Sequence, residues 1–198
     1  SEFYSKQIDE TSLLHFTCFW VDNTNTYIYL ATNKGNIQKR KFSDMSLIQE
    51  HNNTDVLYSI TEDNIQGITG DSTYIYYTIR NASYDVKRRQ SDLGLEKSQK
   101  TFSALAPTDL SSPKGVWTDG TLLFICDDGN NRVIKCNASD FGTPTTYTDY
   151  DGFSDTLSSP TRIWGYGSFI YIGTDNSADP VRKVNKTNLT NDTVSTLT

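Results

Sequence analysis

The sequence has few of the residues from which metal sites and nucleophilic sites are usually built. Among 198 residues it holds two histidines, His15 and His51, three cysteines and one methionine. A zinc site of the usual Cys/His kind therefore lacks ligands, and three cysteines without a C-x-x-C spacing do not form a disulfide framework. The G-x-S-x-G and P-loop motifs are also absent. Together these absences disfavour an enzyme.

Basic residues and long apolar runs are scarce as well. Lysine and arginine number 18 against 24 aspartates and glutamates, which gives a formal net charge of −6. Nucleic-acid binding usually depends on a clustered basic surface, so this balance predicts no nucleic-acid partner. The two basic triplets, 39–41 and 87–89, fit the solvated face of an alternating strand. Since no stretch approaches the roughly 20 apolar residues that cross a bilayer, we expect no membrane insertion.

The sequence is rich in aromatic residues and contains an internal repeat. Phe, Trp and Tyr make up 12% of the chain, too many for a disordered protein. The segment Leu110–Pro113 recurs as Leu157–Pro160, and Trp117 recurs as Trp164, in both cases 47 residues later. Counting back from Trp117 by a similar interval identifies two earlier copies. The equivalent positions in the four copies are Trp20, Thr69, Trp117 and Trp164.

Each copy has the pattern of four short strands joined by tight turns. A turn rich in Asp, Gly and Asn follows the position of the tryptophan, and a run of aromatic and β-branched residues follows the turn. The third strand of every copy has an apolar residue two places before a basic one. These pairs are Ile37/Lys39, Val86/Arg88, Val133/Lys135 and Val181/Lys183. A more polar fourth strand closes each copy, at 46–50, 96–99, 145–148 and 193–197.

Four antiparallel strands in about 48 residues, repeated, are the sequence period of a β-propeller blade. No segment shows sustained helical periodicity, so we expect no helix of consequence. The sequence thus predicts an all-β fold, a single β-propeller domain of four four-stranded blades. We place the blades at about 11–55, 56–106, 107–154 and 155–198, and an extra outer strand at 2–9. The ring closes with four blades, or the chain is a four-blade arc of a larger propeller, or two copies complete a ring as a homodimer.

The third copy resembles an NHL repeat. Residues 112–135 contain, in order, a Pro-x-Gly-Val segment, an Asp-Gly turn and the sequence Asp-x-Gly-Asn-x-Arg-Val, which are the elements of that repeat. The fourth copy keeps part of the pattern, but it has Arg162 where the family has glycine and lacks the Gly-Asn-x-Arg turn. The first two copies keep only the strand pattern. The resemblance implies a propeller architecture for the whole chain, and by itself it implies no ligand.

The elements of the third copy that resemble the NHL repeat have structural roles. If residues 128–131 form a turn, Asp127 and Arg132 are cross-strand neighbours on one face, suited to a charge-assisted hydrogen bond. Gly129 and Asn130 suit positive φ angles in that turn. We therefore interpret these four residues as structural and not as ligands.

The same hairpin register constrains the cysteines. It places Cys126 opposite Val133 and Cys136 opposite Leu123, so that the two thiols project from opposite faces of the sheet. We expect no disulfide between them.

Two sets of residues are candidates for ligand binding. Trp20, Trp117 and Trp164 would suit stacking against a sugar, although their position at the end of the inner strand favours packing between blades. Oxygen-bearing side chains gather in two loops and could hold calcium, but turns recruit Asp and Asn for their own hydrogen bonds. These groups are Asp127/Asp128/Asn130 and Asp175/Asn176/Asp179. We expect no cofactor and no catalytic residue.

The most probable function on these grounds is a non-catalytic binding or structural scaffold module that recognises a protein or a glycan through propeller loops. The alternative is a propeller hydrolase or lyase with a metal in the central channel, for which two histidines are too few ligands. Richness in Asn, Ser, Thr and Tyr with an acidic balance is typical of secreted, cell-surface or phage-particle proteins, but it does not fix the compartment.

Overall fold

The computed structural model describes residues 15–51, 64–79, 86–90, 93, 96–100, 110–141, 145–147, 157–176, 180–189 and 191–194. These residues form sixteen β-strands and one 3-10 turn, and no α-helix occurs among them. The fold is therefore all-β over the described part of the chain, as predicted. No helix within these ranges is long and apolar enough to cross a membrane. The expected outer strand at 2–9 lies outside the described residues.

The strands make four antiparallel sheets, each from four strands that follow one another in the chain. The first sheet contains β1 (Phe16–Val21), β2 (Tyr27–Thr32), β3 (Ile37–Lys41) and β4 (Leu47–His51). The second contains β5 (Ile65–Gly70), β6 (Tyr74–Ile79), β7 (Val86–Gln90) and β8 (Glu96–Lys100). The third contains β9 (Pro113–Thr118), β10 (Leu122–Asp127), β11 (Arg132–Asn137) and β12 (Thr145–Tyr147). The fourth contains β13 (Pro160–Tyr166), β14 (Phe169–Thr174), β15 (Val181–Asn185) and β16 (Asn191–Val194).

Strand register confirms the repeat that the sequence indicates. In every sheet the residue at the tryptophan position of the first strand pairs with an aromatic residue of the second. These pairs are Trp20–Tyr29, Thr69–Tyr76, Trp117–Phe124 and Trp164–Tyr171. The same aromatic residues pair with the predicted basic position of the third strand, at Lys39, Arg88, Lys135 and Lys183. The four expected outer strands are present, the last of them slightly earlier than predicted.

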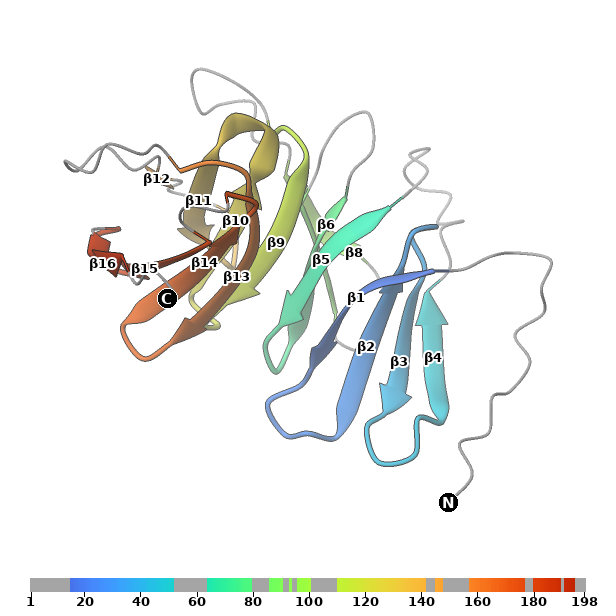
Figure 1. Cartoon of the computed structure of the whole chain (residues 1–198). Coiled ribbons are helices and arrows are strands. Elements are labelled where there is room, and N and C mark those ends of the chain that lie inside the picture. The colour runs from blue at the N-terminus through green and yellow to red at the C-terminus, as the bar shows by residue number, and fades with distance from the viewer. Residues whose placement is uncertain are drawn as a thin grey trace.

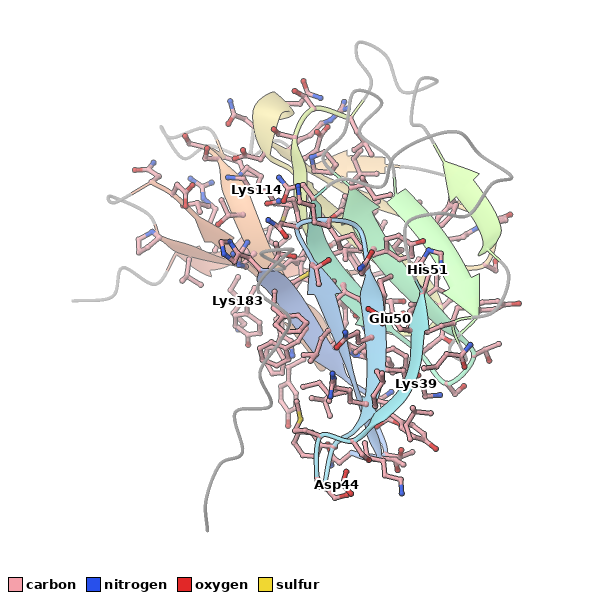
Figure 2. The ribbon with its side chains drawn as sticks, turned by 90° about the vertical axis from the view of Figure 1, so that its right-hand side faces the viewer. Lys39, Asp44, Glu50, His51, Lys114 and Lys183 are labelled. Carbon is pink, nitrogen blue, oxygen red and sulfur yellow. The ribbon has the colours of Figure 1, made fainter. Side chains whose placement is uncertain are left out.

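The four sheets pack side by side in chain order. Their first strands are the ones that meet, β1 with β5, β5 with β9 and β9 with β13, and Figure 1 shows these strands side by side across the middle of the molecule. Strands β13 and β1 are not joined by such packing. Figure 2 shows the first sheet from its outer edge, with Asp44 at the turn between β3 and β4 and His51 at the opposite end of β4.

The core consists of three apolar clusters, one between each pair of neighbouring sheets. Tyr29, Ala31 and Ile37 of the first sheet pack with isoleucines of the second. Tyr76 of the second sheet packs into a cluster of the third, and Phe124, Cys126 and Val133 of the third pack with the fourth. Each inner sheet therefore has a back face toward the preceding sheet and a forward face toward the following one. In the first and last sheets the back and forward faces point in the same directions along the row.

A buried ion pair fixes the β10–β11 hairpin. Arg132 Nε donates to Asp127 Oδ2 at 2.6 Å, and the side chains are 4% and 0% exposed. Asn130 Nδ2 donates to the same oxygen at 2.8 Å, and the backbone N–H of Ser111 donates to Asp127 Oδ1 at 2.6 Å. The predicted structural role of Asp127 and Arg132 is confirmed.

The predicted positive φ angles of Gly129 and Asn130 were wrong. The left-handed residue of this turn is Asn131, with φ of 52°, and it ends the 3-10 turn Asp128–Asn130. Gly129 is required for a different reason, because a Cβ there would come within 3.0 Å of Ser111. The backbone N–H of Gly129 donates to the carbonyl oxygen of Ser111 at 2.7 Å, so the backbones of these two residues lie within hydrogen-bonding distance.

All three cysteines are free thiols. Cys126 pairs with Val133 and Cys136 with Leu123, as predicted. Cys126 lies in the cluster shared with the fourth sheet, whereas Cys136 lies in the cluster shared with the second. The two thiols thus point to opposite faces of the third sheet, which confirms that they form no disulfide.

Candidate functional site: the aromatic face of the last sheet

The three tryptophans do not share one environment. Trp20 and Trp117 lie on forward faces that a following sheet covers, and each contacts a glycine of that sheet. A Cβ on Gly70 would lie 2.7 Å from the indole ring of Trp20, and one on Gly165 would also come within 3.0 Å of the ring of Trp117. These two tryptophans are therefore half-buried between sheets, which fits the packing role that the sequence favours. Sugar stacking by either of them stays a prediction.

Trp164 occupies the same position in the last sheet but is 59% exposed. Its ring lies 6.1 Å from that of Tyr171 at 33°, nearly the geometry of Trp117 with Phe124, 5.7 Å and 33°. Tyr166, which is 71% exposed, lies parallel to Trp164 with an interplanar angle of 7° and a centroid distance of 6.0 Å. We call Trp164, Tyr166 and Tyr171 the aromatic face of the last sheet.

Tyr166 departs from the repeat at a position where the other sheets have aspartate. In the first three sheets this aspartate caps the hairpin, since its Oδ1 atom accepts backbone N–H groups at 2.7–3.0 Å. The capping residues are Asp22, Asp71 and Asp119. A tyrosine has no carboxylate with which to accept these bonds, so the fourth hairpin exchanges a cap for an exposed aromatic ring.

The capping role is visible in the electrostatics of Asp119. Burial by itself would raise the pKa of this carboxyl. Hydrogen bonds from the backbone of Leu122 and Thr121 and from the ammonium of Lys186, 2.8 Å away, outweigh burial and hold the pKa below its usual value. The carboxylate is therefore stabilised in its charged form by the turn that it caps.

The large exposed apolar side chains that the structure describes lie at the two ends of the row of sheets. Each of them belongs to the first or the last sheet or to its turns. These residues are Phe16, Phe19, Phe42, Met45, Leu47, Ile48, Trp164 and Tyr166. None of the described side chains of the middle sheets belongs to this set. The back face of the first sheet and the forward face of the last are thus the candidate interaction surfaces.

The basic residues of the third strands lie along the forward faces. The ammonium of Lys39 is 4.1 Å from the centre of the Tyr27 ring, and that of Lys183 is 3.9 Å from the centre of the Phe169 ring. Lys135 Nζ donates to the carbonyl oxygen of Thr187 in the next sheet at 2.6 Å. Each of these ammonium groups has a partner in the fold, which fits the predicted strand face and gives no sign of a phosphate site.

A cavity of about 280 Å³ lies where the first strands of all four sheets come together. Its lining includes Cys18, Gln66, Val116 and Arg162, one residue from each of those strands. Arg162 is the charged residue of this lining, and its Nη1 atom donates to the carbonyl oxygen of Thr161 at 2.9 Å. Arg162 thus gives the cavity a cationic wall, and the lining residues that the structure describes offer a metal no carboxylate or imidazole.

The two histidines do not lie together. His15 precedes β1 and is exposed, whereas His51 ends β4, the strand at the other edge of the first sheet, and is 7% exposed. Within the described part of the chain, no three residues drawn from His, Cys, Asp and Glu are grouped so as to hold a metal ion. The alternative of a metal-dependent hydrolase or lyase thus finds no ligand set there.

The two oxygen-rich loops meet at a lysine. Lys114 Nζ lies 3.1 Å from Asp128 Oδ2 and 3.7 Å from Asp175 Oδ2. Both oxygens of Asp127 accept hydrogen bonds from protein groups. Asp179 lies outside the described residues. Calcium binding by these groups stays a prediction, and any ion there would have to displace the ammonium of Lys114.

Because of Cys18, the fold should become less stable at alkaline pH. Burial raises the pKa of its thiol to about 11 from 9.0, although a hydrogen bond from Thr17 and the charge of Arg162 partly oppose it. The unfolded thiol ionises first as the pH rises, so the free energy of unfolding should fall between pH 9 and 11, by about 2 kcal/mol from this group. Urea unfolding of the wild type and of Cys18→Ala at a series of pH values isolates this contribution. Equal pH dependence in the two proteins would contradict it.

Comparisons with known proteins support the propeller. No protein-family model matches the sequence, and neither does any curated protein. Among solved structures the chain is similar to a chain in the crystal structure of a nidogen/laminin complex, with a TM-score of 0.65 and 17% identity over 88% of this chain and 61% of that one. It is also similar to the WD40 repeats of RRP9, with a TM-score of 0.64 and 9% identity over 89% of this chain and 48% of that one. The computationally designed protein Ika4 matches with a TM-score of 0.58 and 11% identity, over 89% of this chain and 94% of Ika4.

These likenesses show the fold alone. WD40 repeats form β-propellers, and this chain has four antiparallel four-stranded sheets packed in chain order, so the fold is propeller-like. The chain spans 61% and 48% of the lengths of the nidogen/laminin and RRP9 chains. The NHL-repeat resemblance stays a prediction, since these structures support a propeller without distinguishing that repeat family. The division into four blades at the predicted boundaries likewise stays a prediction.

Proposed function

We propose that the protein is a non-catalytic binding or scaffold module that recognises another protein through the aromatic face of its last sheet. The observation that carries this proposal is Tyr166, which replaces a hairpin cap by a ring that is 71% exposed, directly beside an exposed tryptophan. Both choices cost folding energy, because one loses backbone hydrogen bonds and the other leaves apolar area in water. Residues that weaken a fold in this way are typical of binding sites.

The composition of the aromatic face favours a protein partner. Tryptophan and tyrosine are enriched at the centres of protein interfaces, where their rings bury a large area with little loss of side-chain freedom. The neighbouring charges are Arg162 and Lys183, so the face is cationic on a protein of net charge −6. A partner with an apolar centre and an acidic rim would complement it.

A glycan is the second candidate ligand. The rings of Trp164 and Tyr166 are parallel and exposed, which is the arrangement that stacks against the apolar side of a sugar. Screening of a glycan array with the wild type and with Trp164→Ala tests this candidate. Glycan binding that disappears in the variant would favour it over a protein partner.

Tyr166→Asp separates binding from folding. The substitution restores the aspartate of the other three hairpins, so we expect the free energy of unfolding to rise by about 0.5–1 kcal/mol. We also expect the immobilised variant to retain at least tenfold less of the protein partner than the immobilised wild-type chain retains. Phe19→Thr, on the opposite end of the row, is the matched control and should leave retention unchanged. Equal retention by wild type and Tyr166→Asp would contradict the proposed function.

The three predicted arrangements of the ring differ in what they leave of the aromatic face. Closure of the four sheets on themselves would bury it and contradict the proposed function, a second copy that completes the ring as a homodimer would cover it with this same chain, and an arc of a larger propeller would leave it open to another protein. The mass in solution together with the solvent accessibility of Trp164 distinguishes them. Closure and dimerisation both bury Trp164, and only dimerisation doubles the mass of 22.3 kDa.

A further inference from the structure

We infer that the aromatic face of the last sheet is the docking surface for a further propeller sheet that carries a glycine at the position facing Trp164, and that the protein's own first sheet does not fit there. This inference deepens the proposed function, on which it rests, by naming the kind of protein partner. It follows from the way in which the three internal sheet–sheet junctions are built.

Two of these junctions pair a tryptophan with a glycine. Trp20 meets Gly70, and Trp117 meets Gly165, in each case too closely for any Cβ. The glycine always stands one residue after the tryptophan position of its own strand, as the pairing of Gly70 with Ile75 and of Gly165 with Ile170 shows. An indole on a forward face thus requires a glycine at this position of the next sheet, which we call the receiving position.

The third junction shows what happens without tryptophan. The second sheet has Thr69 at the tryptophan position, and the receiving position of the third sheet is Thr118. Both threonines are buried, at 3% and 7% exposure. A β-branched residue at the receiving position is therefore combined with a residue smaller than tryptophan on the preceding sheet. The larger side chain on one sheet is compensated by the smaller one on the other, so the spacing between the sheets is kept.

The two ends of the row do not match each other by this rule. The forward face of the last sheet presents Trp164, which requires glycine, whereas the receiving position of the first sheet is Val21, opposite Ile28. A valine there would place its Cβ and two methyl groups where the indole must lie. The restriction applies equally to ring closure within one chain and to a second copy. The two glycines of this chain that stand at receiving positions, Gly70 and Gly165, already contact Trp20 and Trp117.

The rest of the last forward face keeps the pattern of a sheet junction. Tyr171 corresponds to Tyr29, Tyr76 and Phe124, each of which is buried against or beside the next sheet. Val181 corresponds to Ile37 and Val133, which are fully buried at their junctions. A face built for water would not keep these side chains in register. The occupant that fits the face is therefore another sheet of the same repeat, one with glycine at its receiving position.

The test extends the full chain by one sheet that obeys the rule. A copy of residues 155–198 is appended after residue 198. The copy carries Trp164→Phe, so that it contributes no tryptophan fluorescence of its own. In the matched control the copy also carries Gly165→Val, the residue type of the first sheet. Acrylamide quenching of Trp164 fluorescence is measured by difference from proteins with phenylalanine at position 164 of the original chain. We expect the quenching constant to fall at least threefold in the extended chain and to stay unchanged in the control.

A second measurement covers the case in which an extension fails to fold. Val21→Gly gives the first sheet a receiving glycine, and Val21→Ala, which still carries a Cβ, is its control. We expect Trp164 to be protected from acrylamide in Val21→Gly and to be accessible in Val21→Ala and in the wild type at all concentrations. The inference would be overturned if Trp164 were protected in the wild type or in either control. It would also be overturned if Trp164 stayed accessible both in the extended chain and in Val21→Gly. The proposed function would survive that outcome if partner retention still depended on Tyr166.

Discussion

Replacing Asp127 by alanine is expected to lower the free energy of unfolding by about 3–5 kcal/mol, the largest effect of any single substitution considered for this protein. The carboxylate is fully buried and accepts bonds from the Arg132 guanidinium, the Asn130 amide and the Ser111 backbone. Its removal leaves a guanidinium that is 4% exposed without its counter-charge. It also releases the segment before β9 from the hairpin that follows β10. Urea unfolding followed by tryptophan fluorescence measures the loss.

Two control variants separate the buried charge from the hairpin. Asp175→Ala removes a carboxylate that is 65% exposed and 3.7 Å from Lys114, and it should change the free energy of unfolding by less than about 0.5 kcal/mol. Asp127→Ala combined with Arg132→Met removes both charges, and it should be more stable than Asp127→Ala alone because no unpaired charge stays buried. A loss below about 1 kcal/mol in Asp127→Ala would show that this ion pair does not hold the hairpin.

Strand register was predictable from the sequence because the repeat supplies it four times. A shift by one residue would move every core side chain of a sheet to the wrong face. The turn predicted at residues 128–131 placed Asp127 opposite Arg132 and Cys126 opposite Val133. Local chemistry and the repeat agreed at these positions, and the structure confirmed them.

The candidate site was not predictable in the same way. The sequence treats the three tryptophans as equivalent, and the repeat gives no reason to separate Trp164 from the others. Its exposure depends on which sheet follows, which is a property of the whole row and not of the local pattern. The one signal in the sequence was Tyr166, the departure from aspartate at the hairpin turn. Glycine roles were similarly hidden, since Gly129 and Gly165 are required by side chains that lie far away in sequence.

The tryptophan–glycine contact between the third and fourth sheets is expected to show strong energetic coupling. Gly165→Thr should cost about 2–3 kcal/mol, because the new side chain collides with the indole of Trp117. Trp117→Thr should cost about 3 kcal/mol, because it removes a ring packed between two sheets. The double variant recreates the Thr69–Thr118 combination of the neighbouring junction. Its cost should therefore be smaller than the sum of the two single costs by about 1–3 kcal/mol.

A matched cycle shows that the coupling belongs to this contact. Gly173 lies on the other face of the same sheet, and a Cβ there would be 3.4 Å from its nearest neighbour, an ordinary contact. Gly173→Thr and Trp117→Thr should therefore add within about 0.5 kcal/mol. Additivity of Trp117→Thr with Gly165→Thr would mean that the sheets move apart to admit the extra volume. In that case Val21 would be no obstacle to Trp164, and the row of sheets would be free to close on itself. Coupling instead means that the spacing between sheets is fixed, so the residue at the receiving position decides which sheet can follow which.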